Sequence, residues 1–144
     1  MNEPGYRPPD LGLVGATHVA RYQETGGEIG YEWNGTEILL LTTTGRKTGQ
    51  RRTSALIYGR DGADYLVVAS AGGAAKHPAW YLNLRANPGA EIQIKAERVR
   101  VTARTATAAE RPRLWRLATG YWPNYDVYQT RTSRVIPLVV LSPS

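Results

Sequence analysis

The sequence predicts an α+β domain in which mostly antiparallel strands curl into a small barrel-like sheet, with helices inserted between them. The length of 144 residues is that of one ordinary domain. Five or six segments rich in aliphatic and β-branched residues are bounded by turn-forming residues, which is typical of strands. Short loops join several of these segments, so we expect the strands to pair antiparallel.

The N-terminal part is expected to form an arm and a helix in front of the main body. Residues 1–9 carry three prolines and one glycine, which predicts a loose arm. Asp10 is placed to cap a helix over residues 11–22, which a Gly-Gly pair ends. We therefore treat residues 1–35 as an N-terminal arm and helix, and residues 36–144 as the body of what is a single domain overall.

The first half of the body predicts three strands. Residues 37–44 and 52–58 are expected to form an antiparallel hairpin across a short basic loop. A turn signal at residues 60–64 then leads to a third strand over residues 65–70.

The second half of the body mixes helices and strands. Pro78 suits the first turn of a helix over residues 79–87, and residues 90–96 and 98–104 alternate as a second hairpin. The remaining expected elements are an amphipathic helix over residues 107–122 opened by a Thr107–Glu110 capping box, a helical turn over residues 125–130, and a strand over residues 135–141.

The charge of the chain is unevenly distributed. Eighteen Lys and Arg against twelve Asp and Glu give a formal net charge of +6. Residues 1–37 hold six acids and two bases (−4), whereas the remainder holds sixteen bases and six acids (+10). A positive body favours an anionic partner, and charge alone leaves a nucleic acid, an acidic membrane surface and a small anionic ligand open.

The composition excludes several kinds of site. Without cysteine there is no disulfide, thiolate nucleophile or Cys-ligated metal, and two histidines do not make a multi-histidine site, so we expect no metal. No apolar run approaches the roughly 20 residues of a membrane helix, and the first ten residues lack the pattern of a signal peptide. We therefore expect a cytoplasmic protein. Since no nucleophile or acid–base set is evident, an enzyme with this sequence would need a cofactor for its chemistry.

Residues 42–52 (TTTGRKTGQRR) are the first candidate binding segment. A strand ends there, two glycines allow tight turns, and four bases lie within seven positions. Backbone N–H groups in such a turn can bind an anion, and Arg and Lys add charge-assisted hydrogen bonds. The segment is not a nucleotide P-loop, because Arg46 rather than glycine precedes Lys47 and a strand follows. The alternative is a solvated hairpin tip.

Residues 68–83 (VASAGGAAKHPAWYLN) are the second candidate segment. A strand runs through Gly72 and Gly73 to the start of a helix, whose free N–H groups favour an anion or a ring oxygen. The small residues would let a flat ligand approach the backbone. The glycine spacing does not fit the dinucleotide fingerprint. The alternative is a simple crossover with Trp80 in the core.

Two tyrosines after Pro123 form a third candidate. Tyr125 and Tyr128 are three residues apart and therefore share a helix face. Their phenols could donate a hydrogen bond or a proton to a reducible oxygen. The alternative is aromatic packing at a corner of the fold.

Three long motifs give the chain a resemblance to a known family. They are LLLTTTGRKTGQRR, YLVVASAGGAAKHPAWYLNLRANP and YWPNYDVYQTRTSRVIPLVVL, within about residues 38–142. In these the chain resembles the deazaflavin-dependent nitroreductases, which are coenzyme F420-dependent quinone reductases of actinobacteria. The resemblance implies an FMN-binding split-barrel-like, deazaflavin-binding domain over residues 36–144. It also implies an oxidoreductase that transfers a hydride from reduced F420 to a quinone, nitroaromatic or similar planar acceptor.

The resemblance also implies the site residues. The coenzyme-binding set would be Arg46, Lys47 and Thr48 at the phosphate, Arg52 and Ser54 nearby, Val68, Ala69 and Ser70 beside the ring, and Lys76, Pro78, Ala79, Trp80, Tyr81 and Asn83 around the helix start. The catalytic set would be Tyr125, Tyr128 and Ser70, with Tyr125 best placed to polarise or protonate the acceptor. The coenzyme has a flat ring and a tail with a phosphate and glutamate carboxylates, which suits the basic loop.

Alternatives stay open beside this interpretation. The chain could be a non-catalytic flavin- or deazaflavin-binding module, or a split-barrel protein that binds FMN. A nucleic-acid binder using the bases of residues 46–52 is a third class, but the loop has no interleaved aromatics and no nucleic-acid-binding signature, so we expect no nucleic acid. Homodimer formation and a peripheral contact with the inner face of the cell membrane are left open by the sequence.

Overall fold

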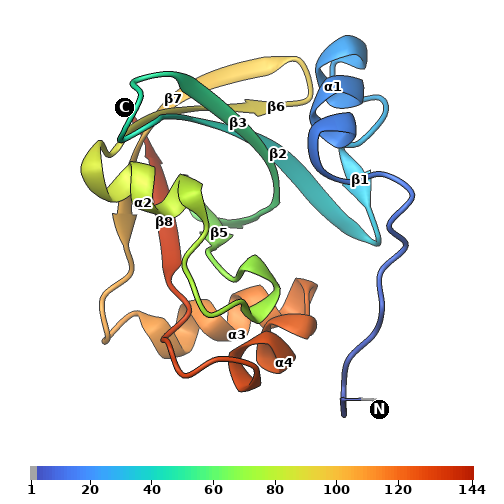
Figure 1. Cartoon of the computed structure of the whole chain (residues 1–144), viewed down its shortest axis with the longest axis vertical. Coiled ribbons are helices and arrows are strands. Elements are labelled where there is room, and N and C mark those ends of the chain that lie inside the picture. The colour runs from blue at the N-terminus through green and yellow to red at the C-terminus, as the bar shows by residue number, and fades with distance from the viewer. Residues whose placement is uncertain (1–2) are drawn as a thin grey trace.

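A strongly curled antiparallel sheet organises the computed structural model, which describes residues 3–144 (Figure 1). The strand order is β1-β2-β6-β7-β8-β5-β4, and β3 pairs with the other edge of β2. The strands are β1 (Glu32–Trp33), β2 (Thr36–Thr44), β3 (Arg51–Ile57), β4 (Gly59–Asp61), β5 (Asp64–Val68), β6 (Gly89–Ile94), β7 (Glu97–Thr105) and β8 (Leu138–Pro143). The helices are α1 (Gly15–Thr25), a 3-10 turn η1 (Ala71–Gly73), α2 (Ala79–Ala86), α3 (Arg111–Tyr121) and α4 (Asn124–Thr130). The predicted α+β class is confirmed.

The central strand β2 is buried on both faces. Leu39 and Leu41 point into the main core with α2, β6 and β7, while Ile38 and Leu40 pack with Tyr22 of α1 on the other face. Successive side chains of a strand point to opposite faces, so covering both faces requires the continuous apolar run found here. Both predicted hairpins are confirmed: β2 pairs antiparallel with β3, and β6 with β7.

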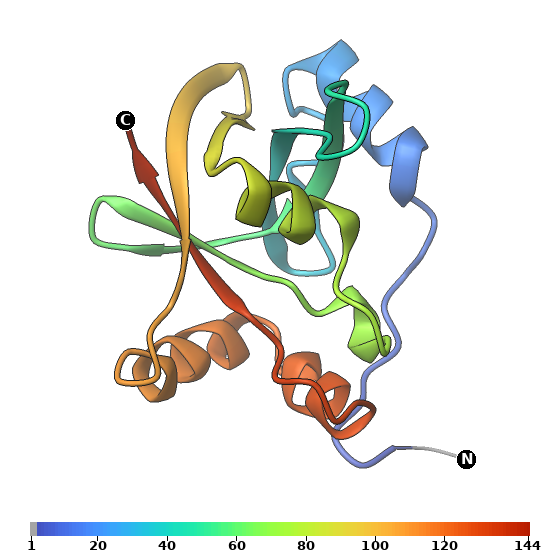
Figure 2. The same cartoon turned by 60° about the vertical axis from the view of Figure 1, so that its left-hand side comes forward.

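A second core lies on the other face of β5 and β8. Leu66 and Val68 pack against Leu114 of α3 and Tyr125 of α4, whereas Val67 between them points into the main core. Figures 1 and 2 show α3 and α4 together at the end of the molecule away from the β6–β7 hairpin. This arrangement brings α4 close to η1, and the two elements pack together.

One buried tyrosine ties α1 to the sheet. The Tyr22 hydroxyl donates to the Ile38 carbonyl at 3.0 Å and accepts from the Lys95 N–H at 2.8 Å. The helix ends at Gly26, and Gly27 follows at φ +84°, where an added Cβ would lie 2.8 Å from the Cα of Lys95. Only glycine allows this close approach of the α1 end to the β6–β7 turn.

The predicted start of the first helix is wrong. The helix begins at Gly15 rather than residue 11, and Asp10 does not cap it. The Asp10 carboxylate instead accepts the Gly12 N–H at 2.9 Å, a local turn that competes with helix formation. Leu11 and Val14 are 62% and 46% exposed, so burial does not extend the helix toward the N-terminus.

Other boundaries shift for local reasons. Thr107 and Glu110 make both bonds of the predicted capping box, at 3.2 and 3.0 Å, but they close a separate turn and α3 starts at Arg111. The last strand begins at Leu138 rather than residue 135, because Val135 is 66% exposed and Pro137 has no N–H to donate. The short strands β1 and β4 were not predicted. The first helix ends at Thr25, three residues beyond the expected residue 22. The other expected strands and helices are found within two residues of their bounds.

Tyr22→Phe is expected to lower the free energy of unfolding by about 1–3 kcal/mol, because the Lys95 N–H loses its acceptor. Urea unfolding followed by circular dichroism measures the change. Tyr65→Phe, at a buried tyrosine of β5, is the matched control. Equal stability of Tyr22→Phe and wild type would mean that apolar contacts alone hold α1.

Candidate functional site

Two open cavities meet at Trp80, which lines both of them. One has a volume of ≈ 570 Å³ and lies between the β2–β3 loop and the start of α2. The other has a volume of ≈ 310 Å³ and lies between β3, the end of β5, η1 and α4. Because they share this side chain, they are neighbours, and we refer to them together as one groove with a basic end and an aromatic end.

The basic end carries four cationic side chains. Arg46, Lys47, Arg51 and Arg52 line it, and no carboxylate is among its described lining residues. The loop that presents them is tightly closed, since the Gly45 N–H donates to the Gln50 carbonyl at 2.7 Å. Such a concentration of charge on a closed hairpin tip is suited to an anionic ligand.

Asn83 of α2 fixes the position of this loop. Its side-chain oxygen accepts the Arg46 N–H at 3.1 Å and the Arg46 guanidinium at 3.4 Å, and its amide nitrogen donates to the Thr43 hydroxyl at 3.1 Å. Asn83 and Thr43 are both buried. A buried amide with all these bonds made is a rigid connection, because breaking it leaves unpaired polar groups.

The aromatic end has a floor of backbone and a wall of tyrosines. Ser70, Ala71 and Gly72 line it where the chain leaves β5, and Tyr125 and Tyr128 line it from α4. Ala71 and Gly72 have φ of +46° and +63°. Small side chains there leave the backbone open to a flat ligand.

Tyr125 is held as a neutral phenol. It is 4% exposed, and its ring stands edge-on to Tyr121 and Tyr128 with centroids 6.4 and 6.1 Å apart. Burial raises the pKa of Tyr125 well above its ordinary value, and the neighbouring phenols Tyr121 and Tyr128 add to the shift. The hydroxyl is therefore protonated at neutral pH and can act as a hydrogen-bond donor.

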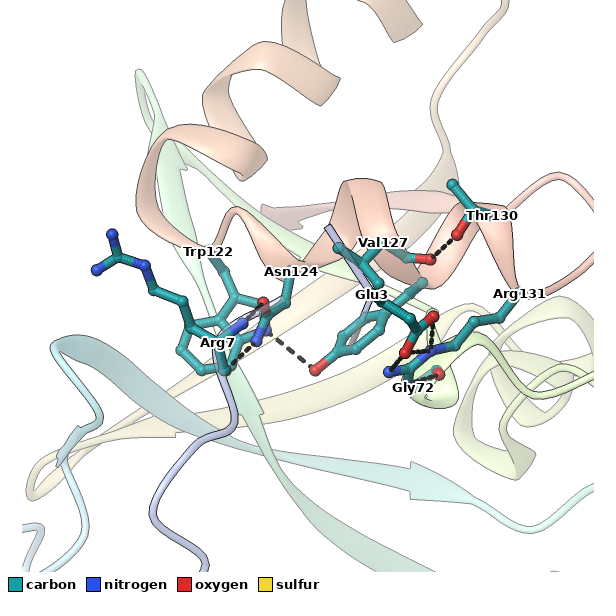
Figure 3. A network of polar contacts seen from close by, with 9 residues as sticks. Glu3, Arg7, Gly72, Trp122, Asn124, Val127, Thr130 and Arg131 are labelled. Atoms are coloured by element: carbon teal, nitrogen blue, oxygen red, sulfur yellow. Dashed lines mark hydrogen bonds and ion pairs between the residues drawn. The ribbon is translucent and has the colours of Figure 1, made fainter. Parts of the chain in front are cut away.

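The N-terminal arm and α1 complete the aromatic end. Val14, Gly15 and His18 line it, and the buried His18 is held by a 2.8 Å contact between its Nε2 and the Gly30 carbonyl. Figures 1 and 2 show the arm running from α1 to α4. It is fastened there by Asn124, which accepts the Arg7 N–H at 2.9 Å and donates to the Arg7 carbonyl at 2.8 Å (Figure 3).

Arg131 makes the second attachment of the arm. Its guanidinium pairs with Glu3 and donates to the Gly72 carbonyl at 3.1 Å (Figure 3). It also stacks over the rings of Tyr6 and Tyr128, at 4.7 and 5.3 Å from their centroids. One side chain therefore joins the arm, η1 and α4 around the aromatic end.

The structure brings most of the predicted site residues to the groove. Arg46, Lys47, Thr48, Arg52, Ser54, Ala79 and Asn83 line the basic end, Val68, Ser70, Pro78, Tyr125 and Tyr128 line the aromatic end, and Trp80 lines both. Three predicted residues line neither cavity. Ala69 is buried in the core, Tyr81 is buried with its hydroxyl 2.8 Å from that of Thr105, and Lys76 is exposed.

Comparison with protein families assigns the chain to a known group. The family model for F420H(2)-dependent quinone reductases matches residues 15–143. The chain belongs to this family. An F420H(2)-dependent quinone reductase of Mycobacterium tuberculosis is 47% identical over 129 residues, which cover 87% of each chain.

Solved structures agree with this assignment. An F420-H2 dependent reductase is 40% identical with a TM-score of 0.67, and the match covers 73% of this chain and 93% of that one. A domain-swapped dimer is 38% identical with a TM-score of 0.70, covering 86% and 93%. A pyridoxamine 5'-phosphate oxidase-like protein of Listeria innocua is 14% identical with a TM-score of 0.54, covering 74% and 83%. The last similarity concerns the fold alone, and it confirms the predicted split-barrel class.

The groove of the reductase fits reduced coenzyme F420, the cofactor of its family. A long ligand with an anionic tail and a flat ring needs a cationic end joined to an open apolar end. The four cations of the basic end, the shared Trp80 and the backbone floor at Ala71 and Gly72 meet these needs.

Within residues 3–144, none of the helices of the reductase has the length and apolar character required to cross a membrane.

Several groove residues were not predicted. Val14, His18, Trp33, Leu56 and Ile57 line the aromatic end. They come from the N-terminal part and from the middle of β3, and in the sequence they are indistinguishable from core positions. Among the described residues, β3 has β2 alone as a strand partner. Its side chains are therefore only half-buried and are available to the groove.

Proposed function

We propose that reduced coenzyme F420 lies along the whole groove, with its anionic tail at the basic end and its ring at the aromatic end. The observation that carries the proposal is that the two cavities are neighbours, with Trp80 lining both of them. A ligand that used only one end would not explain why a cationic loop and an aromatic pocket share a wall.

The basic end would bind the tail by charge. Arg46, Lys47 and Thr48 would hold the phosphate, with Arg52 and Ser54 beside them, because all five line one cavity. Arg46 is pre-positioned by Asn83, so little conformational freedom is lost when the ligand binds. Arg51 lines the same cavity and adds a fourth cation for the carboxylates.

The aromatic end would hold the ring and the acceptor. When bound, the reduced coenzyme supplies a hydride for transfer to the acceptor. The chain aligns the two partners between the Ser70–Gly72 floor and the α4 tyrosines and keeps bulk water out. Tyr125, neutral and buried, would donate a hydrogen bond and then its proton to the reducible oxygen of the acceptor, with Ser70 and Tyr128 beside it.

The acceptor that we propose is a quinone, with a nitroaromatic or similar planar molecule as the alternative. The name of the 47% identical relative supports a quinone. The relative described as a domain-swapped dimer supports assembly of this chain as a homodimer. Action in the cytoplasm, with a peripheral contact at the inner face of the cell membrane, is the location that would bring the enzyme to a lipid-soluble quinone.

Lys47→Ala is expected to weaken coenzyme binding by about 1.5–3 kcal/mol, which is roughly a 10- to 150-fold rise in the dissociation constant, because a charged hydrogen bond to the phosphate is lost. Titration followed by tryptophan fluorescence measures it. Lys95→Ala is the control, since Lys95 stacks on Tyr31 away from the groove. An unchanged dissociation constant for Lys47→Ala would mean that the phosphate binds elsewhere. Tighter binding of FMN than of F420 by the wild-type protein would overturn the choice of cofactor.

Tyr125→Phe is expected to lower kcat by about 10²-fold or more while the coenzyme dissociation constant changes little, because the lost hydroxyl acts on the acceptor. Steady-state kinetics with a soluble quinone and reduced F420 measures the change. Tyr121→Phe is a matched control from the same aromatic cluster, since the Tyr121 hydroxyl is buried and has no partner in residues 3–144. An unchanged kcat of Tyr125→Phe would mean that Tyr125 only lines the pocket and that its hydroxyl does not act on the acceptor.

A further inference from the structure

Arg134 hydrogen-bonds to the backbone that forms the floor of the aromatic end, from outside the groove. It lies in the segment between α4 and β8 and lines neither cavity. Its guanidinium donates to the carbonyls of Ser70 at 2.7 Å, Ala74 at 2.8 Å and Ala69 at 3.1 Å. A further N–H lies 3.0 Å from Nδ1 of His77. We call residues 69–77 the ledge.

The ledge contains one residue, Ala71, whose backbone conformation needs support from its surroundings. Ala71, Gly72 and Gly73 have consecutive positive φ values of +46°, +63° and +83°. A non-glycine residue at positive φ is disfavoured and persists only when its surroundings enforce it. An added Cβ on Gly73 would lie 2.5 Å from the Tyr128 carbonyl, so the ledge is also pressed against α4.

Apart from the Ala69 N–H, which donates to the Pro137 carbonyl at 2.9 Å, the hydrogen bonds to the ledge from the segment between α4 and β8 come from two guanidinium groups. The internal bonds of the ledge are short-range: the Gly73 N–H donates to Ser70 and the Ala74 N–H donates to Ala71. Arg134 satisfies three ledge carbonyls and Arg131 satisfies a fourth, that of Gly72. A planar guanidinium can bond several acceptors at once in fixed directions, which an ammonium group cannot do.

We propose that Arg134 is a positioning residue for the ring of the coenzyme: it holds the ledge in the one conformation that presents Ser70, Ala71 and Gly72 to the groove. The inference rests on the proposed function, since it assigns a ligand to this floor. Arg134 acts through the ledge and not by contact with the ligand, so its removal should weaken binding of the ring and leave binding of the tail intact.

His77 makes this hold depend on pH. Its Nδ1 can accept from Arg134 only while it is unprotonated. Burial lowers the pKa of His77 below its ordinary 6.5, and the charges of Arg134 and of Arg85 on α2 lower it further. The ring of Tyr81, also on α2, packs beside it at 4.9 Å. A lowered folded-state pKa means that the contact is fully present above about pH 6.5 and is lost as the pH falls through the lower value.

The test compares Arg134→Gln and Arg134→Lys with Arg98→Gln, which removes an exposed ion pair to Glu91 as a control. Dissociation constants are measured for F420 and for a ring-free fragment of its phosphate and glutamate tail. Hydrogen exchange at the amides of Gly73 and Ala74 reports the ledge directly, without any ligand. A thermal melt confirms that each variant is folded.

We expect Arg134→Gln to raise the F420 constant about tenfold or more, as for loss of a charged hydrogen-bond set, and to speed exchange at both amides. Binding of the tail fragment should change by less than about twofold. The F420 constant of Arg134→Lys should lie between those of wild type and Arg134→Gln, because lysine keeps the charge but not the planar set of donors. Arg98→Gln should match wild type. Unchanged exchange and F420 binding in Arg134→Gln would overturn the inference, as would equal loss of F420 and fragment binding.

The pH arm gives a second readout that a merely structural role would not move. Wild-type affinity for F420 should be constant above about pH 6.5 and fall as the pH is lowered further, whereas His77→Asn, which keeps an acceptor but cannot titrate, should show a flat profile. The same fall in both proteins would overturn the role of His77. If wild type binds neither F420 nor the fragment, the proposed function fails, and the exchange rates still decide whether Arg134 holds the ledge.

Discussion

One face of α2 sets the positions of both ends of the groove. Trp80 and Asn83 lie three residues apart and therefore share that face, while Tyr81 and Leu84 anchor the helix in the main core. Asn83 fixes the cationic loop through Arg46, and Trp80 forms the wall common to both cavities. Since the helix is held by buried side chains, the distance between the two ends is determined by the packing of the core rather than by flexible loops.

The two ends of the groove differ in the forces that they can exert on a ligand. The basic end is open and cationic, so it contributes charge and rapid capture, and its contribution weakens with salt. The aromatic end is lined mostly by apolar and aromatic side chains, and burial keeps Tyr125 protonated. In the proposed complex, attraction to the tail would supply binding energy far from the reacting atoms, while the aromatic end would supply alignment and a hydrogen-bond donor.

The sequence was sufficient for the elements whose pattern reflects local physics. The run of Ile38 to Leu41, the glycines of the β2–β3 loop and the Pro78 helix start each predicted the structure found. The family motifs predicted the family and most residues of the groove. The start of α1 failed because Asp10 bonds to Gly12, a choice between two local hydrogen bonds that the pattern cannot rank.

What escaped prediction depends on contacts between distant segments. Arg134 belongs to a polar stretch with no periodicity, and its partners at 69–77 are about 60 residues away. Asn124 and Arg7 are 117 residues apart and bond through the Arg7 backbone, which leaves no trace in the side-chain pattern. Ala69, Lys76 and Tyr81 stand inside a binding motif but line neither cavity, so their predicted contact with the coenzyme stays a prediction.

If one molecule of coenzyme occupies both ends of the groove, a crystal structure of the protein grown with F420 will show it directly. Continuous density is expected from the Arg46–Lys47 loop past Trp80 to Ser70 and Tyr125. Density confined to one end, or separate unrelated ligands at the two ends, would contradict this proposal.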